Sequence, residues 1–192
     1  MSSYAEPGYF EQLYQRDPDP WKFATSAYER DKYAATIAAL PERRFRRCFE
    51  VGCSIGVLTR QLAARCEALL GVDVSDTALA QARERCADLP GVRIEAMAVP
   101  GAWPDGRFDL IVFSEVLYYL GIPGIREAAQ RTRDCLQPGG SVVLVNWHGV
   151  TDGACTGDEA AALFLGEAAG WGRVVRGERA EKYRVDVVEA AG

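Results

Sequence analysis

The chain has 192 residues, of which 48% are hydrophobic and 26% charged, and its formal net charge is −5 at pH 7. These values are typical of one globular domain, and the scattered Lys and Arg residues argue against the basic surface of a nucleic-acid-binding protein. The hydrophobic runs are too short to span a membrane, and residues 1–6 lack the pattern of a signal peptide. We therefore expect a cytoplasmic monomer or homodimer that is a single domain over residues 1–192, with a helical cap (1–41) on a core (42–192).

Six cysteines and one histidine, His148, are spread along the chain without a C-x-x-C pair. A zinc site needs closely spaced ligands, so we expect no metal site. The cysteines are interpreted as reduced thiols, as in most cytoplasmic proteins.

The first forty residues predict two helices. Aromatic and aliphatic residues at helical spacing favour a short helix within residues 7–16, and the sequence DPDP at 17–20 ends it. Ser26 and Glu29 form the pattern of a capping box, which predicts a helix over residues 26–40 that stops before Pro41. This segment is expected either to cover a cofactor or to serve as an ordinary packing helix.

The central feature is residues 47–56, RCFEVGCSIG. An apolar run, a turn of small residues and a helical pattern over 57–66 predict a strand, a glycine turn and a helix. Gly52 can adopt a positive φ and allow a ligand to lie against the backbone, and Gly56 allows close packing of the new helix. The turn presents the free amides of a helix N-terminus.

The spacing of this turn favours a nucleoside over a dinucleotide. A pyrophosphate-binding turn has the pattern G-x-G-x-x-G, whereas here Gly52 and Gly56 enclose three other residues and Glu50 precedes them. An anionic Glu50 suits a ligand with positive charge. Asp73, at the end of a second strand over 68–73, can accept hydrogen bonds from ribose hydroxyls. A nucleoside with a cationic tail fits both acids, and S-adenosylmethionine is such a ligand.

The rest of the chain alternates between strand and helix patterns, with two strand-like stretches at its end. We therefore predict an α/β fold with a doubly wound, mostly parallel seven-stranded sheet and an antiparallel C-terminal edge hairpin. The further elements are expected as helix 75–86, strand 92–99, strand 108–114, helix 123–136, strand 141–147, helix 157–169 and strands 173–176 and 183–188.

In such a sheet a ligand binds at the C-terminal ends of the strands, where the strand order reverses. This rule brings the glycine turn, Asp73 and the end of the third strand together around a cofactor. It also places residues 114–115 and 147–148, which end two later strands, near the reactive end of that cofactor.

The quoted motifs resemble those of class I S-adenosylmethionine-dependent methyltransferases: residues 50–56 are similar to their first motif and residues 71–75 to their second, and residues 108–111 and 136–140 are similar to later ones. More narrowly, the chain resembles the nodulation protein S family over nearly its whole length. The segments that carry this narrower resemblance are DPW at 19–21, SAYE at 26–29, FSEVLYYL at 113–120 and TGDE at 156–159.

The resemblance implies a Rossmann-like enzyme that methylates an amine on a small molecule such as a deacetylated oligosaccharide or amino sugar. It carries Glu50, Gly52 and Gly56 to the cofactor turn and Asp73 to the ribose. It also matches the family's N-terminal Trp and Tyr to Trp21 and Tyr28. The cofactor-binding residues expected from the turn, the strand ends and the resemblance are Trp21, Tyr28, Glu50, Gly52, Cys53, Ser54, Gly56, Asp73, Val74, Met97, Ala98 and Ser114.

Three positions in this set need comment. Ser54 stands where the family has a glycine, and Ala98 stands where an acid commonly contacts the adenine amino group. The adenine is then expected to be held by the Ala98 amide and by apolar walls such as Val74 and Met97. Cys53 lies in the turn but is readily explained as a small filler.

The candidate catalytic residues are Glu115, His148 and Tyr118. An amine must lose a proton before it attacks, and Glu115 could accept that proton or hold the ammonium group until the proton leaves. His148 is the other candidate base, and Tyr118 or Tyr119 could orient the acceptor. Glu115 could instead cap a turn, and a lone loop histidine is often merely solvated.

Three other functions stay open. An O-methyltransferase acting on a carboxylate would need a cation in the pocket, and the sequence does not indicate one. A cofactor-binding subunit without activity is compatible with the same cofactor site. A nicotinamide oxidoreductase would need a diphosphate-binding turn, which this chain lacks.

Overall fold

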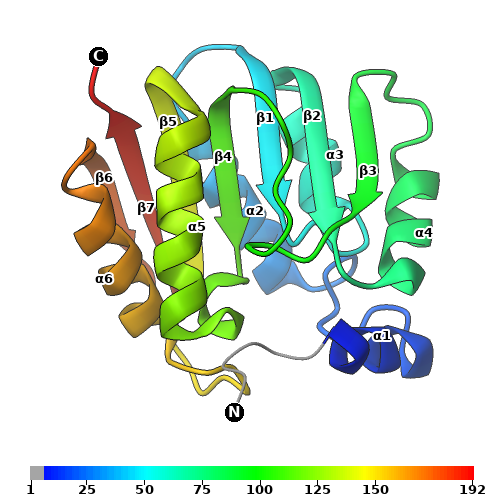
Figure 1. Ribbon diagram of the computed structural model, residues 1–192. Coiled ribbons are helices and arrows are strands. Elements are labelled where there is room, and N and C mark those ends of the chain that lie inside the picture. The colour runs from blue at the N-terminus through cyan, green and yellow to red at the C-terminus, as the bar shows by residue number, and fades with distance from the viewer. Residues whose placement is uncertain (1–6) are drawn as a thin grey trace.

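Strands and helices alternate along the computed structural model, which describes residues 7–192 (Figure 1). Residues 1–6, on which the expectation of no signal peptide rests, lie outside the described residues. The helices are α1 (Pro7–Arg16), α2 (Ala27–Ala39), α3 (Val57–Ala63), α4 (Asp76–Arg85), α5 (Gly121–Cys135) and α6 (Gly157–Ala168), with a short 3-10 turn at Leu117–Tyr119. The strands are β1 (Phe45–Val51), β2 (Cys66–Asp73), β3 (Val92–Ala96), β4 (Phe108–Ser114), β5 (Leu136–Trp147), β6 (Gly172–Arg179) and β7 (Tyr183–Ala190).

The seven strands form one sheet in the order β3-β2-β1-β4-β5-β7-β6. The first five in this order pair in parallel, and β7 pairs antiparallel with both β5 and β6. The predicted doubly wound sheet with an antiparallel edge pair is confirmed. The strand order reverses between β1 and β4, which is where such sheets bind ligands.

Both faces of the sheet are covered by helices, as the apolar strands require. Along β4, Ile111 and Phe113 join the core cluster that includes residues of α5 and α6. Leu110 and Val112 alternate with them and join the cluster that includes residues of α2 and α3. Figure 1 shows α5 and α6 in front of the sheet and α2 behind it. A strand buried on both faces explains the almost unbroken hydrophobic run at 108–114.

Only one of the two predicted capping boxes is complete. At α6, Thr156 accepts a hydrogen bond from the Glu159 amide, and Glu159 accepts one in return from the Thr156 amide. At α2, Ser26 accepts from the Glu29 amide at 3.4 Å. The Glu29 side chain is instead buried toward the interior.

The expectation of reduced thiols is wrong for one pair of cysteines. Cys48 on β1 and Cys66 at the start of β2 form a disulfide, with Cα atoms 6.3 Å apart. The two cysteines are not direct partners in the sheet, since Cys48 pairs with Leu69 and Cys66 with Phe45, but their Cα separation is within the span that a disulfide bridges. Cys53, Cys86 and Cys135 are buried free thiols, as expected, and Cys155 is a partly buried one.

None of the helices in residues 7–192 is long and apolar enough to cross a membrane. No group of three or more His, Cys, Asp or Glu side chains in this range is placed to hold a metal ion.

Candidate functional site

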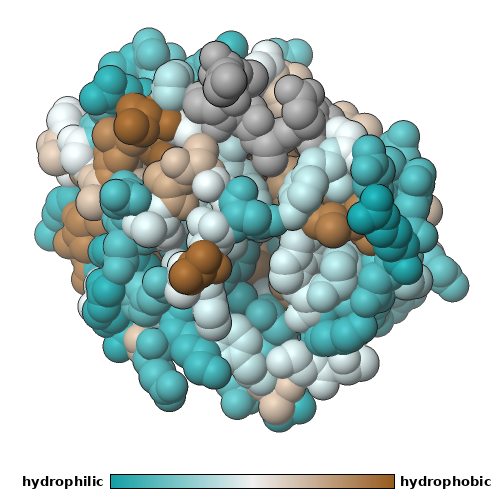
Figure 2. Space-filling view, turned by 90° about the horizontal axis from the view of Figure 1, so that it is seen from below, coloured by the Kyte–Doolittle hydropathy of each residue, from teal (hydrophilic) through white to brown (hydrophobic). Residues whose placement is uncertain are grey.

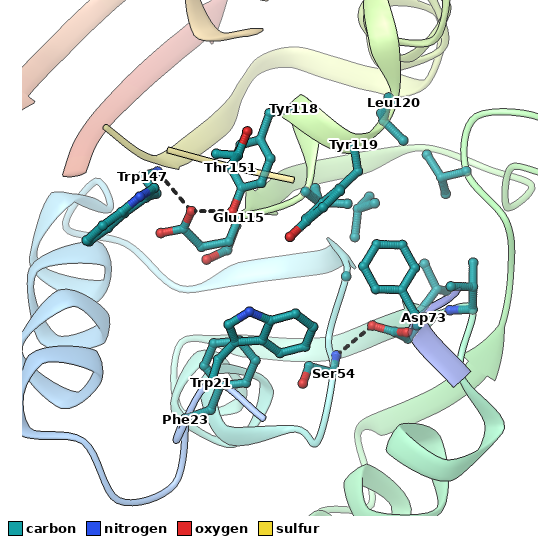
Figure 3. Close-up of a pocket in the computed structure, with 18 of the residues that line it drawn as sticks. Trp21, Phe23, Ser54, Asp73, Glu115, Tyr118, Tyr119, Leu120, Trp147 and Thr151 are labelled. Carbon is teal, nitrogen blue, oxygen red and sulfur yellow. Dashed lines mark hydrogen bonds between the residues drawn. The ribbon is translucent and has the colours of Figure 1, made fainter. Parts of the chain in front are cut away.

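A cavity of about 860 Å³ lies at the C-terminal ends of the parallel strands. Figure 2 views this face of the molecule, which is hollowed near its middle. Residues that follow β1, β2, β3, β4 and β5 all line the cavity, as the rule for open α/β sheets requires. Figure 3 shows Ser54 and Asp73 on one side and Glu115, Tyr118 and Trp147 on the other. We call these sides the turn end and the carboxylate end.

The glycine turn shapes the turn end. Gly52 has φ +76°, and a Cβ atom there would lie 3.3 Å from the Cβ of Val116. The amides of Gly52 and Cys53 both donate to the Val72 carbonyl at 2.9 Å, which ties the turn to β2. Gly52 therefore lines the cavity with bare backbone, in the left-handed conformation that glycine adopts readily.

Asp73 lies beside this turn and lines the cavity. Its Oδ2 accepts from the Ser54 amide at 2.9 Å, and its Oδ1 accepts from the amides of Val74 and Ser75 at 2.8 and 3.0 Å. Burial raises the pKa of Asp73, against these three amides, which lower it. A carboxylate has about four acceptor positions, so Asp73 keeps one for a ligand. The carboxylate is thus part of the turn's own framework as well as a candidate ribose contact.

An apolar wall continues from Asp73. Val74, Met97 and Ala98 line the cavity together with Val99. The Ala98 carbonyl accepts from the Ala102 amide at 2.9 Å. Among the described residues, the Ala98 amide donates to no group, and it is available to a ligand. The expected adenine contacts therefore lie together beside the glycine turn.

Three residues expected to bind the cofactor do not line this cavity. Gly56 has φ +79° and begins α3, and a Cβ atom there would lie 2.9 Å from the Cα of Ala82 on α4. Cys53 is buried, and its Cβ lies 3.1 Å from the position of a Cβ on Gly71. Both positions serve packing, as anticipated for Cys53.

Glu50 is the third such residue and is buried on β1. It lines a separate cavity of about 20 Å³, together with Ser54 and Glu115. Burial raises the pKa of Glu50 to about 7, with Thr59 opposing and Asp73 adding to the rise. Its Oε2 has no hydrogen-bond partner among the described residues. A cavity of this size is large enough for one water molecule.

Helix α1 and the loop after it cover the turn end. The Tyr14 hydroxyl hydrogen-bonds the Ser54 side chain. Glu11 accepts from the hydroxyls of Ser75 and Thr77 at 2.7 and 2.6 Å, at the start of α4. Trp21 stacks on Phe23, with ring centroids 5.6 Å apart, and both line the cavity.

At the carboxylate end, Glu115 follows β4 in a left-handed conformation, with φ +58°. Its Oε1 accepts from Lys32 Nζ at 2.7 Å. Its Oε2 accepts from the Tyr118 hydroxyl at 2.9 Å and from the Trp147 amide at 2.8 Å (Figure 3). Four elements therefore converge on one carboxylate: α2, β4, the turn after it and the end of β5.

Lys32 is the partner that the sequence did not indicate. It is 2% exposed, and its Nζ also lies 2.9 Å from Glu29 Oε2. Burial raises the pKa of Glu29, against the charge of Lys32, which lowers it. Glu29, Lys32 and Glu115 form a buried cluster whose formal charge is −1 when both carboxylates are ionised. We call these three residues the charged cluster.

Aromatic side chains surround the charged cluster. Lys32 Nζ lies 5.2 Å from the centre of the Tyr28 ring, and Tyr28 packs edge-on against Trp147, with centroids 5.8 Å apart. Tyr119 packs beside Tyr118 at 4.7 Å, and its hydroxyl donates to Asp152 at 2.9 Å. Tyr28 was expected at the cofactor, whereas the structure places it at the carboxylate end.

His148 lies outside the cavity lining. Its Nδ1 is 3.3 Å from Asp158 Oδ1, and Asp158 also pairs with Arg179 and Arg184. The structure therefore does not bring His148 together with Glu115 and Tyr118. Ser114, the last residue of β4, does line the cavity.

Several lining residues were not predicted as site residues: Glu29, Lys32, Asp152 and Lys182. Glu29 was interpreted as a helix cap, and Lys32 shares a helical face with Tyr28, which was the only signal for it. Lys182 comes from the turn between β6 and β7 and lies 5.7 Å from the centre of the Tyr28 ring. The sequence did not indicate a cation in the pocket, whereas the structure places Lys32 and Lys182 in its lining.

Comparison with known proteins gives the same family as the motifs. A family model described as nodulation protein S matches residues 9–146. Nodulation protein S of Sinorhizobium fredii is 32% identical over 128 residues, which cover 66% of this chain and 59% of that protein. The homologue of Bradyrhizobium diazoefficiens is 36% identical over 118 residues, 57% of this chain and 54% of that protein. The chain thus spans 54–59% of the length of these relatives.

Solved structures share the architecture. A protein from Pseudomonas syringae, provisionally named a methyltransferase, is 34% identical with a TM-score of 0.75, and the match covers 85% of this chain and 99% of that one. The N-methyltransferase NodS of Bradyrhizobium japonicum, solved with S-adenosyl-L-homocysteine, is 21% identical with a TM-score of 0.80 over 95% of this chain and 98% of that one. At that identity the second match supports the fold alone. The family match over residues 9–146 and the shared fold lead to one conclusion: the chain belongs to the nodulation protein S family.

Proposed function

We propose that the protein transfers a methyl group from S-adenosylmethionine to the nitrogen of an amine on a small molecule, such as an amino sugar or a deacetylated oligosaccharide. One observation carries the proposal: a single cavity joins the glycine turn and Asp73 at one end to a buried cluster of net negative charge at the other. A volume of about 860 Å³ is near the top of the range for small-molecule sites, which leaves room for a cofactor and an acceptor together.

The turn end fits the cofactor. Gly52 offers backbone, Asp73 has an acceptor position for a ribose hydroxyl, and Ala98, whose amide donates to no described residue, lines the cavity beside Met97. Trp21 and Phe23 would cover the cofactor from the N-terminal side. S-adenosylmethionine, when bound, supplies a methyl group activated by a sulfonium centre. The relative from Bradyrhizobium japonicum that was solved with S-adenosyl-L-homocysteine supports this choice.

The carboxylate end fits a cationic acceptor. The charged cluster carries a formal charge of −1 when both carboxylates are ionised, and Tyr118, Tyr119 and Trp147 line the cavity with it, where aromatic rings can attract a cation. Because both Glu115 oxygens already accept hydrogen bonds, we assign Glu115 to holding the ammonium group rather than to removing its proton, which passes to solvent water before the nitrogen lone pair attacks the methyl group. Orientation alone can contribute about 7–11 kcal/mol to such a transfer in favourable cases.

A second candidate, methylation of a carboxylate or hydroxyl oxygen, is favoured by Lys182. This lysine lines the cavity, and no carboxylate in the described part of the chain lies within 4 Å of its Nζ. It would serve an anionic acceptor, whereas Lys32 is already neutralised. A cofactor-binding subunit without activity is the third possibility, and it would bind cofactor and methylate nothing.

The test is to incubate the pure protein with methyl-labelled S-adenosylmethionine and matched acceptors: glucosamine, its oligomers, glucose and a sugar carboxylate. Label on the amine nitrogen, identified by mass spectrometry and NMR, is the expected result. Label found on oxygen alone would favour the second candidate. Saturable cofactor binding with no labelled product from any acceptor would support the third.

A further inference from the structure

The charged cluster contains two carboxylates and one lysine, whereas a general base needs one carboxylate and an ion pair needs one of each. Lys32 Nζ lies 2.7 Å from Glu115 Oε1 and 2.9 Å from Glu29 Oε2, so two carboxylates share one cation. All three side chains are largely buried, with 2% of Lys32, 8% of Glu29 and 13% of Glu115 exposed. Buried charges of this kind are stable only when they are paired, so the count of charges decides what else the site can bind.

Among residues 7–192, Lys32 is the cation that forms ion pairs with these carboxylates. Lys182 also lines the cavity, with its Nζ 5.7 Å from the centre of the Tyr28 ring, and forms no ion pair with either of them. The other titratable groups that face the cluster are neutral at pH 7 or acidic, and none of them cancels its charge. They are Tyr28 and Tyr33 on α2, Asp19 in the loop before it, Glu50 on β1, Tyr118 after β4, Asp152 in the loop after β5 and Tyr183 on β7.

We propose that Lys32 is a specificity-determining residue that sets the acceptor site to a single negative charge, by neutralising one of the carboxylates Glu29 and Glu115, so that the site binds one ammonium group. This inference rests on the proposed function, because it takes an amine as the acceptor. Without Lys32, two like charges would share one buried site, and they could ionise together only at higher pH. Without Glu29, the cluster would be neutral and would lose its preference for a cation.

Charge-counting variants separate this role from a purely structural one. Glu29→Gln leaves a neutral cluster, Lys32→Met leaves two carboxylates, and the double variant E29Q/K32M returns the charge to −1 with Glu115 alone. For glucosamine, we expect E29Q to raise KM at least tenfold with kcat within about threefold, and the double variant to restore KM to within about threefold of wild type. The preference for glucosamine over glucose should fall and recover in the same order.

A second measurement does not depend on activity. In Lys32→Met the folded protein should hold a proton that the unfolded chain releases, so its unfolding equilibrium constant, relative to wild type, should rise by up to about tenfold per pH unit between about pH 5 and 8. Lys22→Met is the matched control, because Lys22 is an exposed lysine paired with Asp17 outside the cavity. It should show no such dependence.

The outcomes are distinct. If wild type methylates no amine, the proposed function fails and the specificity role of Lys32 fails with it, while the unfolding experiment still decides whether Lys32 neutralises a carboxylate. If wild type methylates glucosamine but E29Q and E29Q/K32M share one KM, whether unchanged or raised, the charge assignment is overturned while the function stands. A K32M unfolding curve that follows wild type at every pH also overturns it. Should K32M fail to fold, E29Q and E29Q/K32M still provide the test. Neither variant buries two carboxylates without a lysine between them.

Discussion

Replacing Asp73 with alanine would remove the acceptor of three backbone hydrogen bonds at once. The amides of Ser54, Val74 and Ser75 all donate to this carboxylate, at 2.8–3.0 Å. A hydrogen bond to a charged group contributes about 1.5–3 kcal/mol, and the loss is partly offset because the buried carboxylate no longer has to be desolvated. We therefore expect Asp73→Ala to lower the free energy of unfolding by about 3–6 kcal/mol.

From the motif alone, Asp73→Ala would be expected to weaken cofactor binding far more than folding. The hydrogen bonds of Asp73 change that expectation, because the loss in free energy of unfolding is itself large. Since domains are stable by only about 5–15 kcal/mol, the alanine variant should be close to unfolding. Asp73→Asn keeps one oxygen for Val74 and Ser75 and loses only the bond from Ser54. Cofactor affinity is therefore better measured on the asparagine variant.

The assay is urea denaturation followed by tryptophan fluorescence, with Asp105→Ala as an exposed control. With a slope of about 2 kcal/mol per molar urea, the midpoint of Asp73→Ala should fall by about 1.5–3 M. Asp73→Asn should fall by less, and the control should not change. A midpoint for Asp73→Ala within about 0.3 M of wild type would refute the view that Asp73 supports the turn.

Three further predictions concern residues that do not line the main cavity. Because burial raises the pKa of Glu50 to about 7, the free energy of unfolding of wild type should fall as pH rises from about 4.5 to 7. Relative to wild type, Glu50→Gln should gain about 3 kcal/mol in free energy of unfolding between about pH 4.5 and 8. Urea midpoints of the two proteins that change in parallel with pH would contradict this. Gly56→Ala places a Cβ 2.9 Å from the Ala82 Cα at φ +79° and should cost about 2–4 kcal/mol, so an unchanged Tm would be inconsistent. His148→Asn should keep kcat and KM for the amine within about twofold, because His148 faces Asp158, and a hundredfold loss would return it to the chemistry.

The turn end could be predicted from the sequence because its determinants are local. Gly52 and Asp73 each end a strand, and the pairing of β1 with β2 places Val51 beside Val72. Strand-end acids and glycine turns follow from hydrophobic patterning and from the conformations that glycine allows, and both are visible within about twenty residues. The sheet and the apolar wall near Ala98 follow from the same patterns, whereas the strand order, and so the place where it reverses, comes from the structure.

The carboxylate end could not be predicted in the same way. Lys32 and Glu115 are 83 residues apart, and their contact depends on how α2 packs on the sheet. Glu29 carried a strong local signal as a helix cap, yet its side chain turns inward because Lys32 lies one turn further along the same helix. Lys182 reaches the cavity from an edge hairpin, whose position depends on the order of β7 and β6 in the sheet.

The disulfide shows the same limit. Cys48 and Cys66 are separated by 18 residues and lie on the neighbouring strands β1 and β2, which become neighbours only in the folded sheet. Composition indicated reduced thiols, because no spacing rule connects two cysteines across a strand-turn-helix unit.

The most direct test of the account is calorimetry of the wild-type protein with S-adenosyl-L-homocysteine and, separately, with NAD. The Gly52→Val variant serves as the control. Gly52 has φ +76°, so a β-branched side chain there would distort the turn and fill the space that a ligand needs. We predict saturable one-site binding of S-adenosyl-L-homocysteine by wild type, its loss in Gly52→Val and no binding of NAD. Saturable NAD binding with no heat from S-adenosyl-L-homocysteine would contradict the account.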